Sequence, residues 1–310
     1  MEYMAFVKEQ ALSIGFDACG VARCRPMPEP GRALGEWLRA GRHADMAFME
    51  NHTDLRIDPE RLAEGTKSVV VCLISYKTDR KYADGIPQIA SYARCRDYHY
   101  VVKQKLEQLL DVLKALSPGI TGRCFVDSAP VFEKSWAVEA GLGWTGRHSL
   151  LIHPELGSCC FIGTILTSFE PEEYDLPFAE NHCGTCRRCI DACPTAAIQE
   201  GGLIDARRCC AYQTIENRGP IPDELVPALG ARLFGCDTCQ DVCPWNAKPT
   251  PQNHAVFEPV EGVYDTTGEE WLGMGSGEFK RCFGRTPLAR AGLKKIKQTL
   301  RQKNKPVYGE

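Results

Sequence analysis

The sequence predicts a mixed α/β (α+β) domain, followed by a cysteine-rich module and a short helical, basic segment at the C-terminus. Lys67–Ser75 has the sequence KSVVVCLIS, a continuous apolar run rich in β-branched residues, as expected of a buried strand. From Tyr100 to Leu116, apolar residues recur every third or fourth position, as on one face of a helix. Two later runs of cysteines each end in Cys-Pro. We therefore expect three parts, at residues 1–175, 176–250 and 251–310.

A second strand is expected at 120–126, and it places Asp127 at its carboxyl end. Pro130 suits the first turn of a following helix, because its N–H is missing where a helix needs none. Asp127 or Ser128 would cap this helix and Gly141 would end it. Two further strands, separated by a turn, are expected at 149–152 and 160–168.

Eight cysteines have the spacing of bacterial ferredoxins. The first run is Cys-x2-Cys-x2-Cys-x3-Cys-Pro, and the second ends in Cys-x2-Cys-x3-Cys-Pro after one isolated cysteine. In ferredoxins, three cysteines of a run hold one 4Fe-4S cluster, while the cysteine before proline ligates the other cluster. We therefore predict crossed ligation, with Cys183, Cys186, Cys189 and Cys243 on one cluster and Cys193, Cys209, Cys236 and Cys239 on the second.

Zinc is the alternative for these cysteines, because Cys-x2-Cys pairs also build tetrahedral zinc sites. A zinc ribbon takes four ligands from two such pairs. A run of three cysteines with a fourth before proline is instead typical of iron-sulfur clusters. An electron-carrying module is therefore the favoured interpretation.

The composition, 44% hydrophobic and 25% charged over 310 residues, is that of a soluble globular protein. Clusters need reduced thiolates, so the chain is expected in the cytoplasm, with its other cysteines as free and mostly buried thiols. These are Cys19, Cys24, Cys72, Cys95, Cys124, Cys159, Cys160, Cys210 and Cys282. The N-terminus lacks the features of an export signal, and no stretch is long enough to span a membrane.

The C-terminal segment concentrates positive charge. The net charge of the chain is -3, yet ten Lys or Arg and no Asp or Glu lie between Lys280 and Lys305. Residues 268–305 are expected to be mostly helical, with a break at Gly273–Gly277. A solvated helical face would explain these charges, and contact with a polyanion is the functional alternative.

The segment Gly141–Gly146 (GLGWTG) matches the Gly-x-Gly-x-x-Gly fingerprint of dinucleotide-binding folds. That fingerprint follows a strand and begins a helix, whereas this segment follows an expected helix and precedes an expected strand. We interpret it as a glycine-rich helix exit, either an ordinary turn or a close approach of the backbone to a bulky cofactor. No signature of haem, flavin or nicotinamide is present, so the residues alone indicate an iron-sulfur oxidoreductase.

Six segments together resemble the motifs of epoxyqueuosine reductases. They are YARCRDYH (92–99), FVDSAPVFEK (125–134), EAGLGWTGRHSLLI (139–152), CGTCRRCIDACPTAAI (183–198), RRC with TIEN (207–217) and FGCDTCQDVCPWN (234–246). The resemblance implies a cobalamin-binding domain related to that of reductive dehalogenases, fused to a ferredoxin-like module with two 4Fe-4S clusters. It also implies reduction of epoxyqueuosine at the tRNA wobble position to queuosine and water. The chain is similar to the shorter members, which lack a C-terminal helical-repeat domain.

Asp127 is the proton donor that the resemblance implies, protonating the leaving epoxide oxygen. Capping a helix would favour its carboxylate, so burial against cofactor and substrate has to raise its pKa for this role. A plain N-cap is the alternative.

The cobalamin contacts implied by the family motifs are Arg56, Tyr92, Arg94, Cys95, Asp127, Trp144, Gly146, Arg147, Ser149, Tyr212 and Gln213. Cys95 and His148 stand where the family usually has glycine and asparagine. Cys95 either faces the cobalt side of the pocket or is a structural thiol. The chain has no Asp-x-His-x-x-Gly motif, which favours a base-off cofactor without a protein histidine on cobalt.

For the tRNA, phosphate contacts are expected from Lys294, Lys295, Lys297, Arg301, Lys303 and Lys305, with the modified base extruded into the pocket. An external low-potential donor would supply electrons to a monomer that has no contact with a membrane. Two alternatives stay open at this point: a dehalogenase-like reductase of a small molecule, and a ferredoxin-type electron carrier. The lack of an export signal and the basic C-terminal segment argue against the first.

Overall fold

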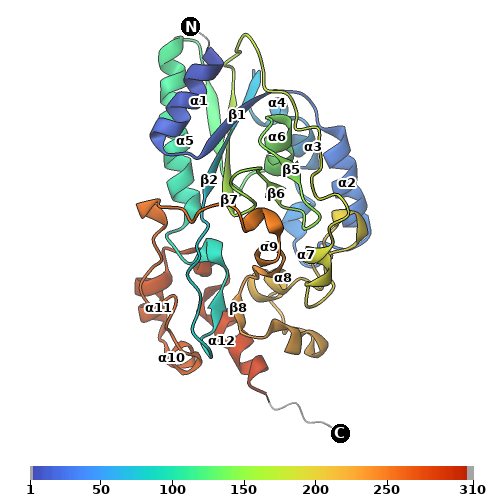
Figure 1. Ribbon diagram of the computed structural model, residues 1–310, viewed down its shortest axis with the longest axis vertical. Helices are drawn as coiled ribbons and strands as arrows, with labels where there is room; N and C mark the ends of the chain where they lie inside the picture. The colour runs from blue at the N-terminus through green and yellow to red at the C-terminus, as the bar shows by residue number, and fades with distance from the viewer. Residues whose placement is uncertain (1–2, 306–310) are drawn as a thin grey trace.

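A four-stranded antiparallel sheet forms the centre of the first part of the chain (Figure 1). The computed structural model describes residues 3–305. The strand order is β1 (Ala18–Arg23), β2 (Ser68–Ser75), β7 (Cys160–Thr167) and β4 (Gly122–Phe125). Every residue of β2 is buried, which confirms the strand expected at 67–75. Because all pairings are antiparallel, the domain is of the α+β kind.

Helices cover both faces of this sheet, which explains why its central strands are apolar throughout. On one face, α5 (Tyr98–Leu116) and α1 (Tyr3–Ile14) share a hydrophobic core with β2. On the other, α6 (Glu133–Glu139) packs against β2 and β7 (Figure 1). Three further helices precede β2: α2 (Pro28–Arg39), α3 (Thr53–Ile57) and α4 (Pro59–Leu62).

The start and end of two predicted elements differ from the expectation for identifiable reasons. α5 begins two residues earlier than expected, because the Asp97 side chain accepts a hydrogen bond from the His99 amide at 3.0 Å and so caps the helix. Only Leu151–Ile152 (β6) of the strand expected at 149–152 forms. It pairs with β5 (Trp144–Thr145) and not with β7.

The glycine-rich segment is a helix exit, as predicted. Gly141 has φ 72° and its N–H donates to the Val138 carbonyl at 3.1 Å, which ends α6. A Cβ on Gly143 would lie 2.0 Å from the Ile152 carbonyl oxygen, so only glycine allows β5 and β6 to pair. The segment therefore leads into a short antiparallel hairpin and not into the helix of a dinucleotide-binding fold.

The cysteine-rich module and the C-terminal segment form the lower half of the molecule in Figure 1. The module contains short elements: α7 (Arg188–Asp191), α8 (Cys210–Ile215), β8 (Arg232–Phe234) and α9 (Thr238–Asp241). β8 pairs in parallel with β3 (Gln88–Ile89) of the first part. The C-terminal helices are α10 (Gly268–Gly273), α11 (Ser276–Phe283) and α12 (Gly292–Lys303), with the expected break between the first two.

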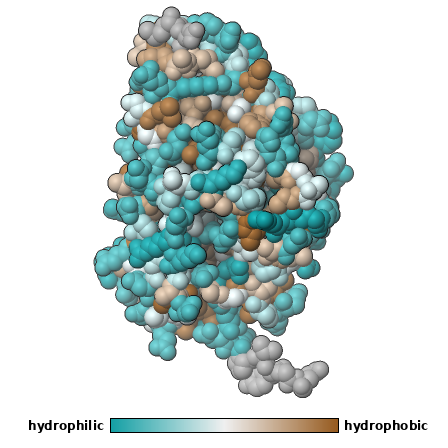
Figure 2. Space-filling model, in the orientation of Figure 1, coloured by the Kyte–Doolittle hydropathy of each residue, from teal (hydrophilic) through white to brown (hydrophobic). Residues whose placement is uncertain are grey.

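The C-terminal helices are integral to the fold. Trp271, Phe283 and Ile296 are buried with Ile89 of β3 and Phe234 of β8 in one hydrophobic cluster. The face seen in Figure 2 is mostly hydrophilic, with hydrophobic residues in small separate patches. Among residues 3–305, none of the helices combines the length and apolar character that crossing a bilayer requires.

Candidate active site

Asp127 stands on a strained turn directly after β4. Its φ is 57°, in the left-handed region that residues other than glycine rarely adopt. The Ser128 N–H donates to the Val126 carbonyl at 2.6 Å and closes the backbone tightly around Asp127. Strain of this kind persists where surrounding contacts enforce it, and it is common at functional sites. β4 therefore delivers Asp127 as predicted, in a conformation that has to be held.

The helix cap expected at this turn is wrong. α6 begins at Glu133, its N-cap residue is Phe132, and no side chain caps it. Pro130 lies in the bend before the helix, because its fixed φ suits a bend as well as a first helical turn. The Asp127 carboxylate is directed to α5 instead.

Two side chains in the first turn of α5 contact the Asp127 carboxylate. The Tyr98 hydroxyl donates a hydrogen bond to Asp127 Oδ2 at 2.7 Å, and His99 Nε2 lies 3.5 Å from the same oxygen. Tyr98 is buried and stacks on Phe161 of β7, with 4.2 Å between ring centroids. The other ring nitrogen of His99, Nδ1, lies 2.6 Å from Asp97 Oδ1. His99 is therefore placed between two carboxylates.

The ionisable groups of this cluster differ widely in proton affinity. Contact with His99 lowers the pKa of Asp127 below its ordinary value. Desolvation acts in the opposite direction and would raise this pKa, while the hydrogen bond from Tyr98 lowers it further. Burial disfavours the charged form of His99, but its contacts with Asp127 and Asp97 outweigh burial and raise its pKa to about 9. Burial, and then the charge of Asp127, raise the pKa of Glu133 to about 8. Near neutral pH, Asp127 is therefore a carboxylate while His99 and Glu133 hold protons.

The side chains of Asp127 and Lys134 are accessible and yet closely surrounded by protein, and we call the space beside these two residues the hollow. The Asp127 side chain keeps 64% of its surface accessible, and Lys134 is also exposed. Protein nevertheless surrounds both groups closely enough for desolvation to act on their pKa values, and it lowers that of Lys134. Lys134 Nζ donates to the Ser149 carbonyl at 2.7 Å, and Ser149 has a left-handed φ of 61°. Two strained residues therefore border the same hollow.

Gly146 and Ser149 form a tight turn beside it. The Ser149 N–H donates to the Gly146 carbonyl at 2.9 Å, and Ser149 Oγ donates to the Gly202 carbonyl. A Cβ on Gly146 would lie 2.6 Å from Ile152 Cδ1 and 2.9 Å from His148 Cε1, so a larger residue would have to displace these side chains. Burial lowers the pKa of His148 to about 4, which keeps its ring neutral.

Three of the expected cobalamin contacts have a buried nitrogen without a hydrogen-bond partner among the described residues. These atoms are Arg56 Nε, Trp144 Nε1 and Arg147 Nε. Trp144 is 3% exposed and packs edge-on against Trp245, with 4.8 Å between centroids. Arg147 donates from Nη2 to the Gly184 carbonyl at 2.8 Å. Because buried donors are nearly always paired in folded proteins, the protein alone leaves these positions incomplete.

Three other expected contacts already have partners or neighbours within the protein. The Tyr212 hydroxyl donates to Asp45 Oδ2 at 2.9 Å. Gln213 Nε2 donates to the Arg207 carbonyl at 2.6 Å. Tyr92 is half-buried, and its ring lies between those of Tyr98 and Phe234. These side chains are therefore held in place before any cofactor binds.

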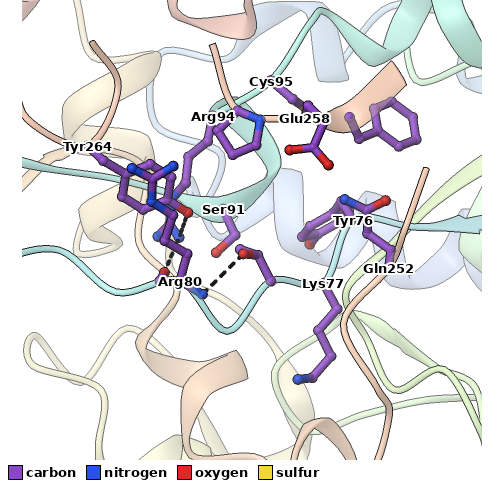
Figure 3. A pocket seen from close by; sticks show the side chains of 12 residues that line it. Tyr76, Lys77, Arg80, Ser91, Arg94, Cys95, Gln252, Glu258 and Tyr264 are labelled. Carbon is purple, nitrogen blue, oxygen red and sulfur yellow. Dashed lines mark hydrogen bonds between the residues drawn. The ribbon is translucent and has the colours of Figure 1, made fainter. Parts of the chain in front are cut away.

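Arg94 and Cys95 line a separate cavity of about 240 Å³, shown in Figure 3, which Asp127 does not line. Arg94 donates from Nε to the Ile89 carbonyl at 2.7 Å and from Nη1 to the Tyr264 hydroxyl at 3.1 Å. Its Nη2 lies 3.2 Å from Asp237 Oδ2 in the cysteine-rich module. Arg94 thus links all three parts of the chain. Burial raises the pKa of Cys95 to about 12, so it is a neutral thiol.

The two cysteine runs approach each other as crossed ligation requires. Cys243 of the second run is packed against Cys183 of the first. In the other group, burial and then the charges of Cys236 and Cys193 raise the pKa of Cys209. Within residues 3–305, no three His, Cys, Asp or Glu side chains converge as a site for a single metal ion would require. Both contacts join cysteines that were assigned to the same cluster, and the full ligand sets stay a prediction.

Two of the six basic residues expected to bind phosphate donate hydrogen bonds within the protein, and the expectation is wrong for Lys295, which is buried. Lys295 is 4% exposed, and its Nζ donates to the Gly219 carbonyl at 3.1 Å. Lys303 Nζ donates to the Arg232 carbonyl at 3.2 Å. The sequence showed their charge but not the packing of α12 against the cysteine-rich module. The four others, Lys294, Lys297, Arg301 and Lys305, are at least partly exposed.

Comparison with known proteins gives this site its context. Residues 182–246 match the family model described as "4Fe-4S double cluster binding domain", and residues 56–128 match "Epoxyqueuosine reductase QueG, DUF1730". A curated epoxyqueuosine reductase of Cyclobacterium marinum is 42% identical, over 93% of this chain and 93% of its own. This chain belongs to the epoxyqueuosine reductase family. It therefore carries a module for two 4Fe-4S clusters, and zinc is excluded as the interpretation of the cysteines.

Solved structures of epoxyqueuosine reductases have the same fold. One, determined with a tRNA-Tyr stem loop that carries epoxyqueuosine, is 30% identical with a TM-score of 0.88, covering 96% of this chain and 80% of that one. Another, from Bacillus subtilis, is 28% identical with a TM-score of 0.88, again covering 96% of this chain and 80% of that one. In that structure, a catalytic loop named after one of its aspartates is swung out of the active site.

Four residues around Asp127 were not predicted from the sequence. Tyr98, His99, Glu133 and Lys134 all lie inside segments that carry the resemblance, but none was assigned a role. The detectable signal was Asp97 before the amphipathic pattern, because an Asp there predicts a helix cap. Starting the helix at Tyr98 would have placed Tyr98 and His99 in its first turn.

Proposed function

We propose that this protein reduces epoxyqueuosine in tRNA to queuosine, with cobalamin and two 4Fe-4S clusters as cofactors and Asp127 delivering a proton to the leaving oxygen. The observation that supports this most strongly is the Asp127 carboxylate, held in a strained turn against His99 at the border of a hollow. Family membership supplies the substrate class, since relatives are named epoxyqueuosine reductases.

The stoichiometry defines what the site has to provide. Removing the epoxide oxygen breaks two C–O bonds, forms one C=C bond and releases water, which consumes two electrons and two protons. The clusters carry electrons one at a time from an external low-potential donor. The protons have to come from side chains in the hollow, because they are needed at the leaving oxygen.

The side chains around Asp127 hold such protons. To store the proton itself, Asp127 would need its pKa raised by burial against cofactor and substrate, whereas in the protein without them its contact with His99 lowers that pKa. Asp127 therefore works as a relay, which takes a proton from His99 and passes it to the oxygen. The pKa of His99, raised to about 9 by its two carboxylate neighbours, keeps that proton available at neutral pH. Asp97 stabilises the charged ring from the opposite side at 2.6 Å.

Several of the expected cobalamin contacts suit that cofactor by their chemistry. Arg56, Trp144 and Arg147 have donor nitrogens that lack partners within the described residues, and the amide and phosphate oxygens of cobalamin are matching acceptors. Gly146 keeps the backbone free of a side chain, and Ser149 turns it sharply. When bound, cobalamin would supply the electron pair that cleaves the C–O bond.

The remaining parts of the proposal concern the tRNA and the setting of the protein. A relative was solved with a tRNA stem loop carrying epoxyqueuosine, and the exposed basic residues of α12 suit phosphate contacts here. An unpaired wobble base can be extruded into the hollow at little cost. Reduced cluster ligands fit a cytoplasmic protein, which we expect to be a monomer.

The test is an anaerobic incubation of the cluster-loaded protein with cobalamin, a low-potential reductant and tRNA containing epoxyqueuosine. Digestion and nucleoside mass spectrometry would then measure queuosine. We expect conversion that depends on both cobalamin and reductant. If epoxyqueuosine persists although cobalamin is bound and both clusters are intact, the proposed function is wrong.

A further inference from the structure

Few polar contacts connect the Asp127 turn with other elements among the described residues. Its carboxylate touches Tyr98 and His99, while its backbone N–H donates to Glu133 Oε1 at 2.7 Å. Ser128 binds only back to Val126 of the same turn through its N–H. Among the described residues, the Glu133 contact is therefore the hydrogen bond that connects the strained Asp127 backbone with another element.

Glu133 is well placed to act as an anchor. It is the first residue of α6, whose Trp136 and Ala137 are fully buried beneath it against the sheet. A carboxyl group on this helix consequently has a fixed position. The left-handed φ of Asp127 costs roughly 1–3 kcal/mol and needs such an external restraint.

We propose that Glu133 is a positioning residue for the proposed reaction, and that its carboxyl group fixes the Asp127 turn to α6 so that Asp127 stays against Tyr98 and His99. This inference rests on the proposed function only for its consequence in catalysis. The contact itself is a property of the protein without cofactor or substrate.

The charge of the anchor matters because a second carboxylate beside Asp127 would repel it. Burial and the charge of Asp127 keep Glu133 protonated near neutral pH, and its carbonyl oxygen still accepts the Asp127 amide. Arg56, Lys134 and His99 are the cationic groups near it. A glutamine at this position would therefore reproduce both the acceptor and the absence of charge.

A different function for Glu133 makes different predictions. Acidic residues in a first helical turn stabilise the helix through its dipole, and Glu133 could serve only that purpose. In that case its removal would lower stability slightly and leave the position of Asp127 unchanged. The two possibilities are separated by a probe of Asp127 itself.

His99 is that probe, because part of its raised pKa comes from contact with Asp127. We would titrate His99 by NMR in the cluster-loaded protein without cobalamin or tRNA, with the resonance assigned from His99→Gln. Asp127→Asn shows the shift that full loss of the contact produces. Glu133→Ala should move the His99 pKa in the same direction by about one unit toward its ordinary value near 6.5, and Glu133→Gln should keep the wild-type value.

Glu139→Ala is the matched control, since Glu139 lies on the same helix and pairs with Arg25 at 2.6 Å, away from Asp127. It should leave the His99 titration unchanged. In single-turnover assays, Glu133→Ala should reduce the rate about tenfold or more at unchanged tRNA affinity, because a misplaced donor slows chemistry and not binding. Glu133→Gln should stay near the wild-type rate.

An unchanged His99 titration in folded Glu133→Ala would overturn the inference, and so would Glu133→Gln behaving like Glu133→Ala. If the protein does not act on epoxyqueuosine, the single-turnover rates give no information. The His99 titration still decides whether Glu133 positions Asp127.

Discussion

The His99 imidazole faces the Asp127 carboxylate, with Nε2 3.5 Å from Oδ2. This pair joins the first turn of α5 to the turn after β4. It divides proton storage and proton delivery between two residues. His99 stores a proton at neutral pH, while Asp127 reaches into the hollow, where its side chain stays 64% accessible. Neither residue alone would both store the proton and reach the substrate.

The first prediction concerns pH. Because the folded-state pKa of His99 is raised to about 9, its charged form and its ion pairs are fully present below pH 6.5 and are lost as pH rises through about 9. Single-turnover rates should therefore fall on the alkaline side near pH 9. His99→Gln should lower the rate about 100-fold and remove this alkaline limb. A His99→Gln enzyme with the wild-type pH profile would exclude the relay.

A second prediction concerns the link between the parts of the chain. Arg94 and Asp237 form an ion pair with side chains only 11% and 13% exposed. Arg94→Ala leaves a poorly hydrated carboxylate behind and should cost about 3 kcal/mol in chemical unfolding. Arg80→Ala is the control, because the exposed Arg80 only lies over the Tyr264 ring, at 4.1 Å, and should cost less than about 1 kcal/mol. Equal losses would show that the ion pair is not a structural link.

The third prediction tests the crossed ligation. Cys243→Ser changes the second cysteine run but should remove the cluster held mainly by the first, so iron content should fall from about eight to about four atoms per chain. EPR of the reduced protein should lose one of two interacting signals. Cys282→Ser is the control, because Cys282 is exposed and outside both runs. Retention of both clusters in Cys243→Ser would contradict the predicted ligand sets.

A fourth prediction concerns tRNA binding by the exposed face of α12. Deleting this helix would remove the buried Ile296 and Leu300 and expose the hydrophobic cluster that they cover, so substitution is the better experiment. We would combine three substitutions, Lys294→Glu, Lys297→Glu and Arg301→Glu. Together they should weaken tRNA binding, and the slope of log binding constant against log salt concentration should fall by the equivalent of up to about three phosphate contacts. The matched control is Lys103→Glu with Lys114→Glu on α5, at exposed positions. An unchanged salt slope in the α12 variant would remove this face from the tRNA footprint.

The sequence alone predicted those elements that depend on a local pattern of residues. The apolar run at Lys67–Ser75, the periodicity after Tyr100 and the cysteine spacing each specify structure within a few neighbouring residues, and all three were predicted correctly. Gly141 was also predicted correctly, because a helix end depends on local backbone geometry.

What the sequence did not reveal depends on contacts between distant segments. The pairing of Tyr98 and His99 with Asp127 needs α5 and β4 to be adjacent in the folded sheet. A helix cap was therefore the structural contact expected of Asp127, and its contacts with His99 and Tyr98, which lower its pKa, were not predicted. Lys295 looked like a phosphate ligand for the same reason, since only packing buries it.

The central claim is that Asp127 delivers the proton that opens the epoxide, and Asp127→Asn tests it most directly. The variant should retain both clusters and bind cobalamin and tRNA, since its amide preserves the shape of the side chain. In an anaerobic single-turnover assay with reductant, followed by nucleoside mass spectrometry, wild-type protein should form queuosine and Asp127→Asn should form at least 100-fold less. Queuosine formation by Asp127→Asn at the wild-type rate would contradict the account.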